Sequence, residues 1–326
     1  MIRVEGLSKS FKVAKRSTGL REGFKALFFR EYLHVQALKD ISFSIEPGEI
    51  VGYIGPNGAG KSTTIKVMSG ILVPDDGTCS IMGFTPWKDR VQYVKNIGVV
   101  FGQRSQLWWD VPVVDSFELL RDIYKIPEKE YKETIDLLAA SLDLNELFNI
   151  PVRQLSLGQR MRCEIAASLL HSPKILFLDE PTIGLDAVSK IAVRQFIKTI
   201  NKQKGVTVIL TTHDMNDIEA LADRVILIGK GSLLYDGKLN ELRERFGTNK
   251  TITVDYRENP NRFVLPSGTS LISWSTERAV LSVNTEQVVI SEVVAQLSNT
   301  VDLVDMEIES QPIEEIIVQL YKDYQI

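Results

Sequence analysis

The chain has 326 residues, 44% of them hydrophobic and 25% charged, which is enough for about two domains and excludes a disordered or fibrous protein. Its net charge of −4 gives no overall positive field that would attract nucleic acid, so phosphate binding must come from local sites. Cys79 and Cys163 are too few for a disulfide framework, and the apolar runs are far shorter than the ~20 residues of a membrane span. We therefore expect a cytoplasmic protein.

The first two-thirds of the chain predict an α/β core. IRVEGLSKSF and QALKDISFSIEPGEIVGYIG alternate apolar and polar residues, which is typical of short strands, and the second stretch runs into a glycine loop. Compact apolar runs then alternate with helical patterns: IGVVF (97–101), KILFLDE (174–180), VTVILTTH (206–213) and DRVILIG (223–229). Such runs predict a parallel sheet covered on both faces, and residues 105–173 predict a helical insert on it.

Residues 14–36 interrupt the first pair of predicted strands. Apolar residues fall near one face at helical spacing, at Leu20, Phe24, Leu27, Phe28 and Tyr32. Basic residues outnumber the acidic Glu22 and Glu31, and they are Lys15, Arg16, Arg21, Lys25 and Arg30. The pattern predicts a basic amphipathic helix, which would contact a membrane or a partner protein, or would pack on the domain's own sheet.

Beyond residue 235 the α/β alternation ends. The polar stretch 236–247 is predicted to be a linker, and residues 248–326 a small α+β domain without a catalytic constellation. Its expected strands are TITVDY, TSLISWS, RAVLSV and VDLVDMEIE, and its expected helices are TEQVVISEVVAQLSN and IEEIIVQLYKDY.

The segment GPNGAGKST, from Gly55 to Thr63, fits the pattern G-x-x-x-x-G-K-[ST] between a predicted strand and a predicted helix. Its glycines let several backbone N–H groups converge on a β-phosphate, Lys61 can reach the β- and γ-phosphate oxygens, and Ser62 can ligate Mg²⁺. A chance match in a chain of this length is on the order of one in a hundred. The expected nucleotide contacts are Gly55, Asn57, Gly58, Ala59, Gly60, Lys61, Ser62 and Thr63.

Two carboxylates stand at the end of the apolar run KILFLDE. Asp179 is expected to hold Mg²⁺ through water, because Mg²⁺ keeps several waters in phosphate sites. Glu180 is expected to be the base that polarises the attacking water. Ligands bind where the strands of a parallel sheet end, which favours this interpretation over a surface pair of acidic residues.

His213 ends the run VTVILTTH, and Gln103 follows the run IGVVF. A single histidine in such a place is more often structural, and a loop glutamine is more often simply exposed. Combined with the phosphate loop and the two carboxylates, His213 becomes a candidate contact to the γ-phosphate. Gln103 becomes a candidate sensor of the metal and the attacking water.

The segment QLSLGQR, residues 154–160, predicts a second anion site at a helix start. The Ser156 hydroxyl and the backbone N–H of Gly158 lie where a helical pattern begins. Because the first phosphate site is already complete within the chain, we expect the second to meet the γ-phosphate held by another chain. Under a twofold axis, one such patch gives two identical sites.

In this order the motifs resemble those of the nucleotide-binding subunits of ABC transporters, over about residues 1–235. The matches are GPNGAGKST as Walker A, Gln103 as the Q-loop glutamine, LSLGQ as the signature, ILFLDE with Glu180 as Walker B, IGLD ending in Asp186 as the D-loop, and His213 as the switch histidine. The resemblance implies a P-loop NTPase core with an antiparallel β subdomain and a helical insert. It also implies an ATPase in which two subunits close head to tail around two ATP molecules, with Ser156, Gly158, Gln159 and Asp186 near the nucleotide.

The sequence departs from the family pattern in two places. The usual L-S-G-G-Q has a leucine here at Leu157, and because leucine resists positive φ, we expect ordinary helical angles there with the side chain directed away from nucleotide. The aromatic residue that stacks on adenine in this family is usually a tyrosine after the first strand. Phe11 is the nearest match.

LSLGQRMR, RSQLWWD and the additional C-terminal domain are most similar to the drug-resistance, lipid and polysaccharide exporter branch, whose membrane-spanning subunits are separate chains. That similarity implies a homo- or heterodimer on the inner face of the cell membrane, attached through those partners. Trp108 and Trp109 are candidates for docking the partner's coupling helix, since aromatic anchors are favoured in interfaces. They could instead pack within the helical insert. We expect one of the two to dock the partner and the other to pack inside the insert.

Two alternatives belong to other functional classes. ABC-type ATPases that act on nucleic acid or the ribosome usually have two cassettes, long coiled coils or zinc-binding cysteines, which this chain does not have, so we expect no nucleic-acid partner. A regulatory module that holds ATP but barely cleaves it is disfavoured by Glu180 and His213. The favoured prediction is an ATPase, using ATP and Mg²⁺, that drives export through membrane-spanning partners.

Overall fold

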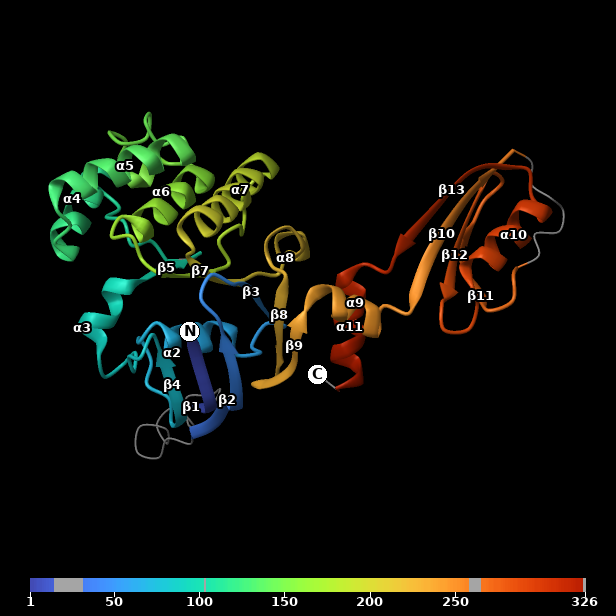
Figure 1. Ribbon diagram of the computed structural model, residues 1–326, viewed down its shortest axis with the longest axis horizontal. Coiled ribbons are helices and arrows are strands. Elements are labelled where there is room, and N and C mark those ends of the chain that lie inside the picture. Colours follow the sequence, from blue (N-terminus) through green and yellow to red (C-terminus); the bar gives the residue numbers. More distant parts are fainter. Residues whose placement is uncertain (15–31, 103, 258–264, 325–326) are drawn as a thin grey trace, which may run out of the picture. The chain divides into compact units, whose positions relative to one another are not determined.

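The computed structural model describes residues 1–14, 32–102, 104–257 and 265–324. They form two compact units, Met1–Gly237 and Lys238–Ile326, shown in Figure 1. No helix in these described ranges is both long and apolar enough to cross a membrane.

A six-stranded sheet is the centre of the first unit, with the strand order β5-β6-β7-β3-β8-β9. Its strands are β3 (Ile50–Ile54), β5 (Ile97–Phe101), β6 (Ile175–Asp179), β7 (Thr207–Thr211), β8 (Arg224–Gly229) and β9 (Ser232–Lys238). The ladders from β5 through β8 are parallel. The four apolar runs of the sequence coincide with four of these strands because a strand buried on both faces is mostly apolar.

Helices cover this sheet and form the insert. Those that follow sheet strands are α2 (Lys61–Met68), α7 (Ala187–Lys204) and α8 (Met215–Leu221). A short α3 (Arg90–Tyr93) and the 3₁₀ turn η1 (Val94–Asn96) precede β5. The insert contains α4 (Val113–Tyr124), α5 (Glu128–Leu142), η2 (Val152–Gln154) and α6 (Leu157–Leu169), which lie together in Figure 1. The predicted helical insert is confirmed.

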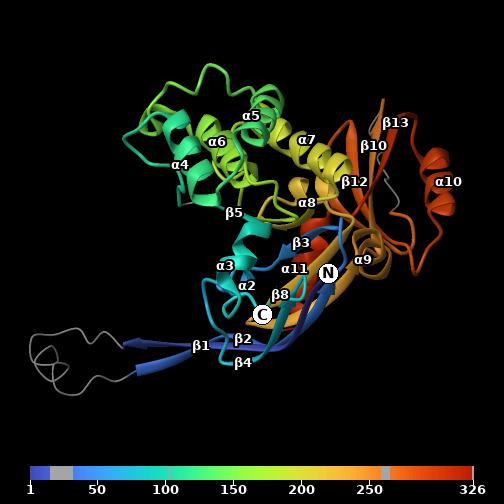
Figure 2. The same cartoon turned by 60° about the vertical axis from the view of Figure 1, so that its left-hand side comes forward.

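A three-stranded antiparallel sheet completes the first unit, in the order β2-β1-β4. Its strands are β1 (Ile2–Ala14), β2 (Tyr32–Ile45) and β4 (Asp76–Ile81). Figure 2 shows β1 and β2 running on together past the end of β4. The predicted amphipathic helix at 14–36 falls mostly on 15–31, outside the described residues. At residues 32–36 the prediction is wrong, because this stretch pairs with β1 as a strand.

The second unit contains a four-stranded sheet of order β11-β12-β10-β13. Its elements are α9 (Leu239–Phe246), β10 (Asn249–Tyr256), β11 (Thr269–Trp274), β12 (Arg278–Asn284), α10 (Ile290–Thr300), β13 (Leu303–Ser310) and α11 (Ile313–Asp323). The stretch 236–247, expected to be a linker, instead contains α9. That helix forms because its Leu239 and Leu242 are buried, which stabilises an otherwise polar segment.

Candidate functional site

The phosphate loop, Gly55–Thr63, leaves β3 and ends in the first turn of α2. A Cβ atom on Gly55 would lie 2.5 Å from the Ile228 carbonyl oxygen, so no side chain fits there. Gly60 has φ of 110°, and a Cβ on it would lie 2.6 Å from the Ala37 carbonyl oxygen. Both positions therefore require glycine, and the loop can keep its backbone N–H groups turned toward an anion.

Lys61 is the first residue of α2 and is only 6% exposed. Its Nζ donates to the carbonyl oxygens of Gly55 over 2.7 Å and Pro56 over 3.3 Å. Burial lowers the pKa of Lys61, and the nearby Glu180 and Asp179 carboxylates raise it. The amino group thus lies directly under the loop, where the charge of a bound phosphate would favour its protonated form.

Asp179 ends β6 beside the start of α2. Its Oδ1 accepts hydrogen bonds from the Thr211 hydroxyl over 2.5 Å and from the Ser62 hydroxyl over 3.3 Å. A hydroxyl and a carboxylate oxygen at this separation suit two neighbouring positions of an octahedral Mg²⁺ ion, which prefers oxygen ligands and keeps several waters. The donor chemistry of Ser62 and Asp179 therefore fits Mg²⁺, with Asp179 binding directly or through one of the waters of the ion.

Glu180 and His213 face each other at the ends of β6 and β7. His213 Nε2 lies 2.7 Å from Glu180 Oε1. The backbone of Glu180 has φ of 56°, in the left-handed region, and its N–H donates to the Thr211 carbonyl over 3.0 Å. Such a conformation costs an ordinary residue on the order of 1–3 kcal/mol and is typical of functional sites.

A cavity of about 270 Å³ opens beside this pair. It is lined by Glu180, Thr182, Ile183, Gly184, Lys190, Thr212, His213 and Asp214. The side chains that could polarise a water molecule therefore lie at the end of the parallel strands, next to accessible space.

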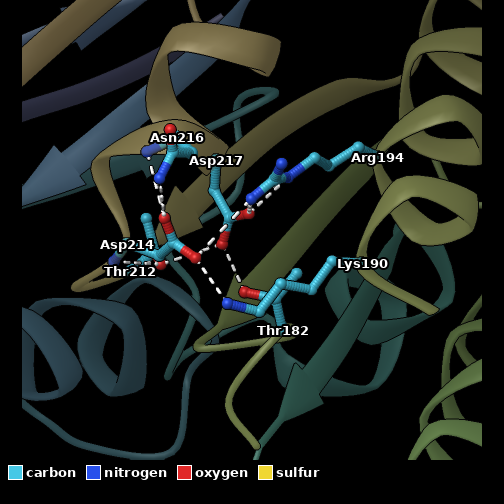
Figure 3. A network of polar contacts seen from close by, with 7 residues as sticks. All are labelled: Thr182, Lys190, Arg194, Thr212, Asp214, Asn216 and Asp217. Atoms are coloured by element: carbon cyan, nitrogen blue, oxygen red, sulfur yellow. Dashed lines mark hydrogen bonds and ion pairs between the residues drawn. The ribbon is translucent and has the colours of Figure 1, made fainter. Parts of the chain in front are cut away.

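A network of polar contacts, shown in Figure 3, connects the segments on either side of this pair. The centre is Asp217 on α8, which is fully buried. It accepts from the Thr182 hydroxyl, from the Thr212 hydroxyl over 3.1 Å and from Arg194 Nε over 2.5 Å. Asp214, the N-cap of α8, accepts from Lys190 Nζ over 2.5 Å. The network joins α7 to the segment that follows His213, at Asp214 and Asp217.

The signature segment, Gln154–Arg160, begins α6 with a capping box. The Ser156 hydroxyl accepts from the Gln159 N–H over 3.2 Å, and Gln159 Oε1 accepts from the Ser156 N–H over 2.9 Å. Leu157 is the first helical residue, with ordinary helical geometry as expected for leucine. Ser156 is exposed at the helix start, where the first N–H groups have no intrahelical acceptor.

Gly158 of this segment is buried against α7. A Cβ on Gly158 would lie 2.6 Å from Ser189 Oγ. Asp186 caps α7, accepting from the Ser189 N–H over 2.8 Å and from its hydroxyl over 2.9 Å, and these bonds lower the pKa of Asp186. The starts of α6 and α7 therefore lie next to each other.

The other predicted site residues lie as follows. Asn57 and Gly58 are exposed at the tip of the phosphate loop, whereas Ala59 is buried. Thr63 follows Ser62 on α2 and is half-buried. Phe11 is half-buried on β1, where it pairs with Val35. Gln103 lies outside the described residues.

The loop after β5 exposes two aromatic side chains. Trp108 is 42% exposed and Trp109 is 51% exposed, so the expectation that one of them packs inside the insert is wrong. Leu107, which is 5% exposed, occupies the interior instead. Arg160 of α6 lies over the Trp109 ring, 5.7 Å from its centroid.

Several residues at the site were missed from the sequence. Thr211 holds both Asp179 and Glu180, and Asp217 and Arg194 join α8 to α7. Gly102 lets the chain pass close to Glu180, whose carbonyl oxygen would be 2.5 Å from a Cβ there. The sequence does not single out Asp217, because Asn216 and Glu219 on the same short helix are polar as well.

Comparisons with known proteins agree with this geometry. The family profile described as ABC transporter matches residues 38–183. The Bacillus subtilis ABC transporter ATP-binding protein NatA is 34% identical over 210 residues, which are 64% of this chain and 85% of NatA. The linearmycin resistance ATP-binding protein LnrL of the same organism is 33% identical, covering 67% of this chain and 69% of LnrL. The chain spans only 26% of a Dictyostelium discoideum ABC transporter A family member that it also matches.

A solved structure shows the same fold. The dimeric post-hydrolysis state of the ATP-binding cassette MJ0796, bound to ADP and Pi, superposes with a TM-score of 0.61 at 27% identity, covering 73% of this chain and 99% of that one. The first unit is accordingly a P-loop NTPase core with its antiparallel β subdomain and helical insert. The chain belongs to the ABC transporter family, among its ATP-binding proteins.

Proposed function

We propose that this protein hydrolyses ATP as one of two subunits that close around two nucleotides, and that hydrolysis drives export through separate membrane-spanning chains. The observation that carries the proposal is the placement of Ser62, Asp179, Glu180 and His213 around the phosphate loop. This set supplies a cation ligand pair, a base and a γ-phosphate contact at one edge of the sheet.

Each residue has a chemical task in this proposal. Lys61 and the loop N–H groups hold the β- and γ-phosphates of ATP, and a Mg²⁺ ion held by Ser62 and Asp179 would neutralise developing charge on them. Glu180 orients the attacking water and accepts its proton. His213, within 2.7 Å of Glu180, fixes that carboxylate and contacts the γ-phosphate. Gln103, on the segment after β5, is proposed to sense the metal and the water.

The signature segment is proposed to act on the other subunit's nucleotide. Ser156 is exposed at the start of α6, where a helix N-terminus favours an anion. The γ-phosphate would displace Gln159 from its capping contact or share it, and Asp186 would lie nearby on α7. ATP then holds the two copies together, and its hydrolysis releases them.

The proposed transport role draws on the relatives and on the exposed tryptophans. NatA and LnrL are named as ATP-binding proteins of a transporter and of a resistance system, which favours export. Trp108 and Trp109 provide an aromatic surface for a membrane-spanning partner. The protein would therefore work at the inner face of the cell membrane, attached through that partner.

The test separates binding from hydrolysis. In Glu180→Gln the base is lost while the phosphate contacts remain, so we expect kcat to fall by about a hundredfold or more and MgATP to trap a stable dimer in size-exclusion chromatography. Lys61→Ala is the matched control, because it should weaken ATP binding and prevent the trapped dimer. A Glu180→Gln variant that stays monomeric at saturating MgATP would contradict the shared site.

A further inference from the structure

Glu164 lies in the middle of α6 and is only 4% exposed. Its carboxylate accepts from the Ser105 hydroxyl and from the Gln106 backbone N–H, the latter over 3.1 Å. The Gln106 side-chain amide donates in turn to the Glu164 backbone carbonyl over 2.9 Å. One acidic residue of the helix therefore holds two consecutive residues of the loop after β5.

The same loop presents the exposed Trp108 and Trp109. Arg160, one turn before Glu164 on α6, lies over the Trp109 ring. We call residues 105–109 the tryptophan loop. It is joined to α6 at two successive turns, by hydrogen bonds at Glu164 and by a cation–π contact at Arg160.

Stability alone does not account for a carboxylate at this place. Burial raises the pKa of Glu164, and hydrogen bonds from Ser105 and the backbone of Gln106 lower it only in part. An apolar side chain would avoid the cost of burying a charge, so the contacts with the loop are what Glu164 contributes. Glu164 lies eight residues after Ser156, which is about 12 Å along a rigid helix.

We propose that Glu164 is a positioning residue that fastens the tryptophan loop to α6, so that the placement of this loop and the placement of Ser156 at the start of the same helix depend on each other. The inference rests on the proposed function, because it needs Ser156 to meet the nucleotide of a second copy. It adds the residue that connects the tryptophan loop to the helix that makes this contact.

The experiment measures hydrogen exchange and ATPase kinetics on the full chain. In the Glu180→Gln background, MgATP should slow exchange in 156–160 and change it in 105–109. Adding Glu164→Ala should raise exchange of the Gln106 amide about tenfold without ATP, since its acceptor is lost. The same variant should reduce the ATP-dependent change in the tryptophan loop at least about threefold while the dimer still forms.

Kinetics in the otherwise unaltered chain distinguish positioning from general damage. Glu164→Ala leaves the phosphate loop intact, so we expect KM for ATP within about twofold and kcat lower by about tenfold, as for a misplaced contact. Glu164→Gln should restore most of kcat, because its amide can accept from Gln106 and donate to Ser105. Ser168→Ala is the matched control: Ser168 is buried on the same helix, and its hydroxyl donates to the Ile165 carbonyl of its own helix rather than to the tryptophan loop.

The outcomes separate the two proposals. A dimer that forms with ATP, in which Glu164→Ala leaves both loop exchange and kcat unchanged, overturns the inference and leaves the proposed function standing. Absence of any ATP-dependent dimer in the Glu180→Gln background contradicts the proposed function and the inference with it. If Glu164→Ala does not fold, Gln106→Ala removes the amide that donates to the Glu164 carbonyl from the loop side, and it should move loop exchange and kcat in the same directions.

Discussion

Asp217 on α8 and Glu164 on α6 both fasten a loop to a helix from a buried position, but their surroundings differ. Asp217 accepts from the guanidinium of Arg194 as well as from two hydroxyl groups. Glu164 accepts from a hydroxyl and a backbone N–H, both neutral, and the charge of Arg160 nearby only partly offsets the effect of burial on its pKa. The α7–α8 contact is therefore held by a compensated charge, and the contact of α6 with the tryptophan loop by an incompletely compensated one.

This difference indicates that the contact at Asp217 is stronger than the contact at Glu164. A buried ion pair loses several kcal/mol when one partner is removed, because the other charge stays uncompensated. A carboxylate bonded by neutral groups loses only hydrogen bonds. The segments next to Glu180 and His213 are therefore held by the stronger contact, and the tryptophan loop is held by the weaker one.

The largest expected change in the free energy of unfolding comes from breaking the Asp217–Arg194 ion pair. Asp217→Ala should lower the free energy of unfolding by about 2–4 kcal/mol, because half-buried Arg194 would lose its nearer carboxylate and keep Asp214 at 3.6 Å, while the Thr182 and Thr212 hydroxyls would lose their acceptor. Urea denaturation followed by circular dichroism measures this, with Asp136→Ala as the control, since Asp136 is exposed on α5. A loss below about 1 kcal/mol would mean that the two contacts are equally weak.

An intermediate effect is expected for the pair taken together. Removing both charges in Arg194→Ala with Asp217→Ala should cost about 1–3 kcal/mol less than the sum of the single variants, since no uncompensated charge remains. The same urea titrations supply the double-mutant cycle. Exact additivity would show that the guanidinium does not compensate Asp217.

The smallest effect is a pH dependence at Glu164. Burial raises the folded-state pKa of Glu164 above its ordinary value, so folding binds a proton there and stability falls as pH rises through that window. Glu164→Gln does not titrate, so its Tm minus that of the parent should rise by about 1–3 °C from acid to neutral pH.

Differential scanning fluorimetry across buffers of increasing pH records this trend. Glu146→Gln, at an exposed site, is its control and should show a flat difference. A difference that falls with pH at position 164 would mean that Glu164 is stabilised as an anion, and that the contrast with Asp217 is mistaken.

Much of the fold was predictable because its signal is local. The stretches Ile97–Phe101 and Ile175–Leu178 have no charged or hydrogen-bonding side chain, as is typical of buried parallel strands. The helix α9 was missed because its apolar positions are few, and only burial of Leu239 and Leu242 makes it form. Tyr32 fits helical spacing equally well, but pairing with β1 places it in a strand.

In the candidate site too, some residues are marked by a local sequence pattern and others are not. The phosphate loop and the Asp179–Glu180 pair have fixed spacings that a sequence displays. Thr211, Arg194 and Glu164 act through residues distant in the chain, so no local pattern marks them. Their positions become clear only when strands and helices are brought together.

The close fit of Gly158 against Ser189 has a consequence for engineering chimaeras. Because there is no room for a Cβ between them, the first turns of α6 and α7 fit closely together, and a change in one requires a change in the other. Leu157 strengthens this fit, since its Cδ2 would lie 2.7 Å from a Cβ on Gly184. A signature segment transplanted from another family member would not fit the residues that face it. We expect such a chimaera to work only when the facing stretch from Gly184 to Ser189 is transplanted with it.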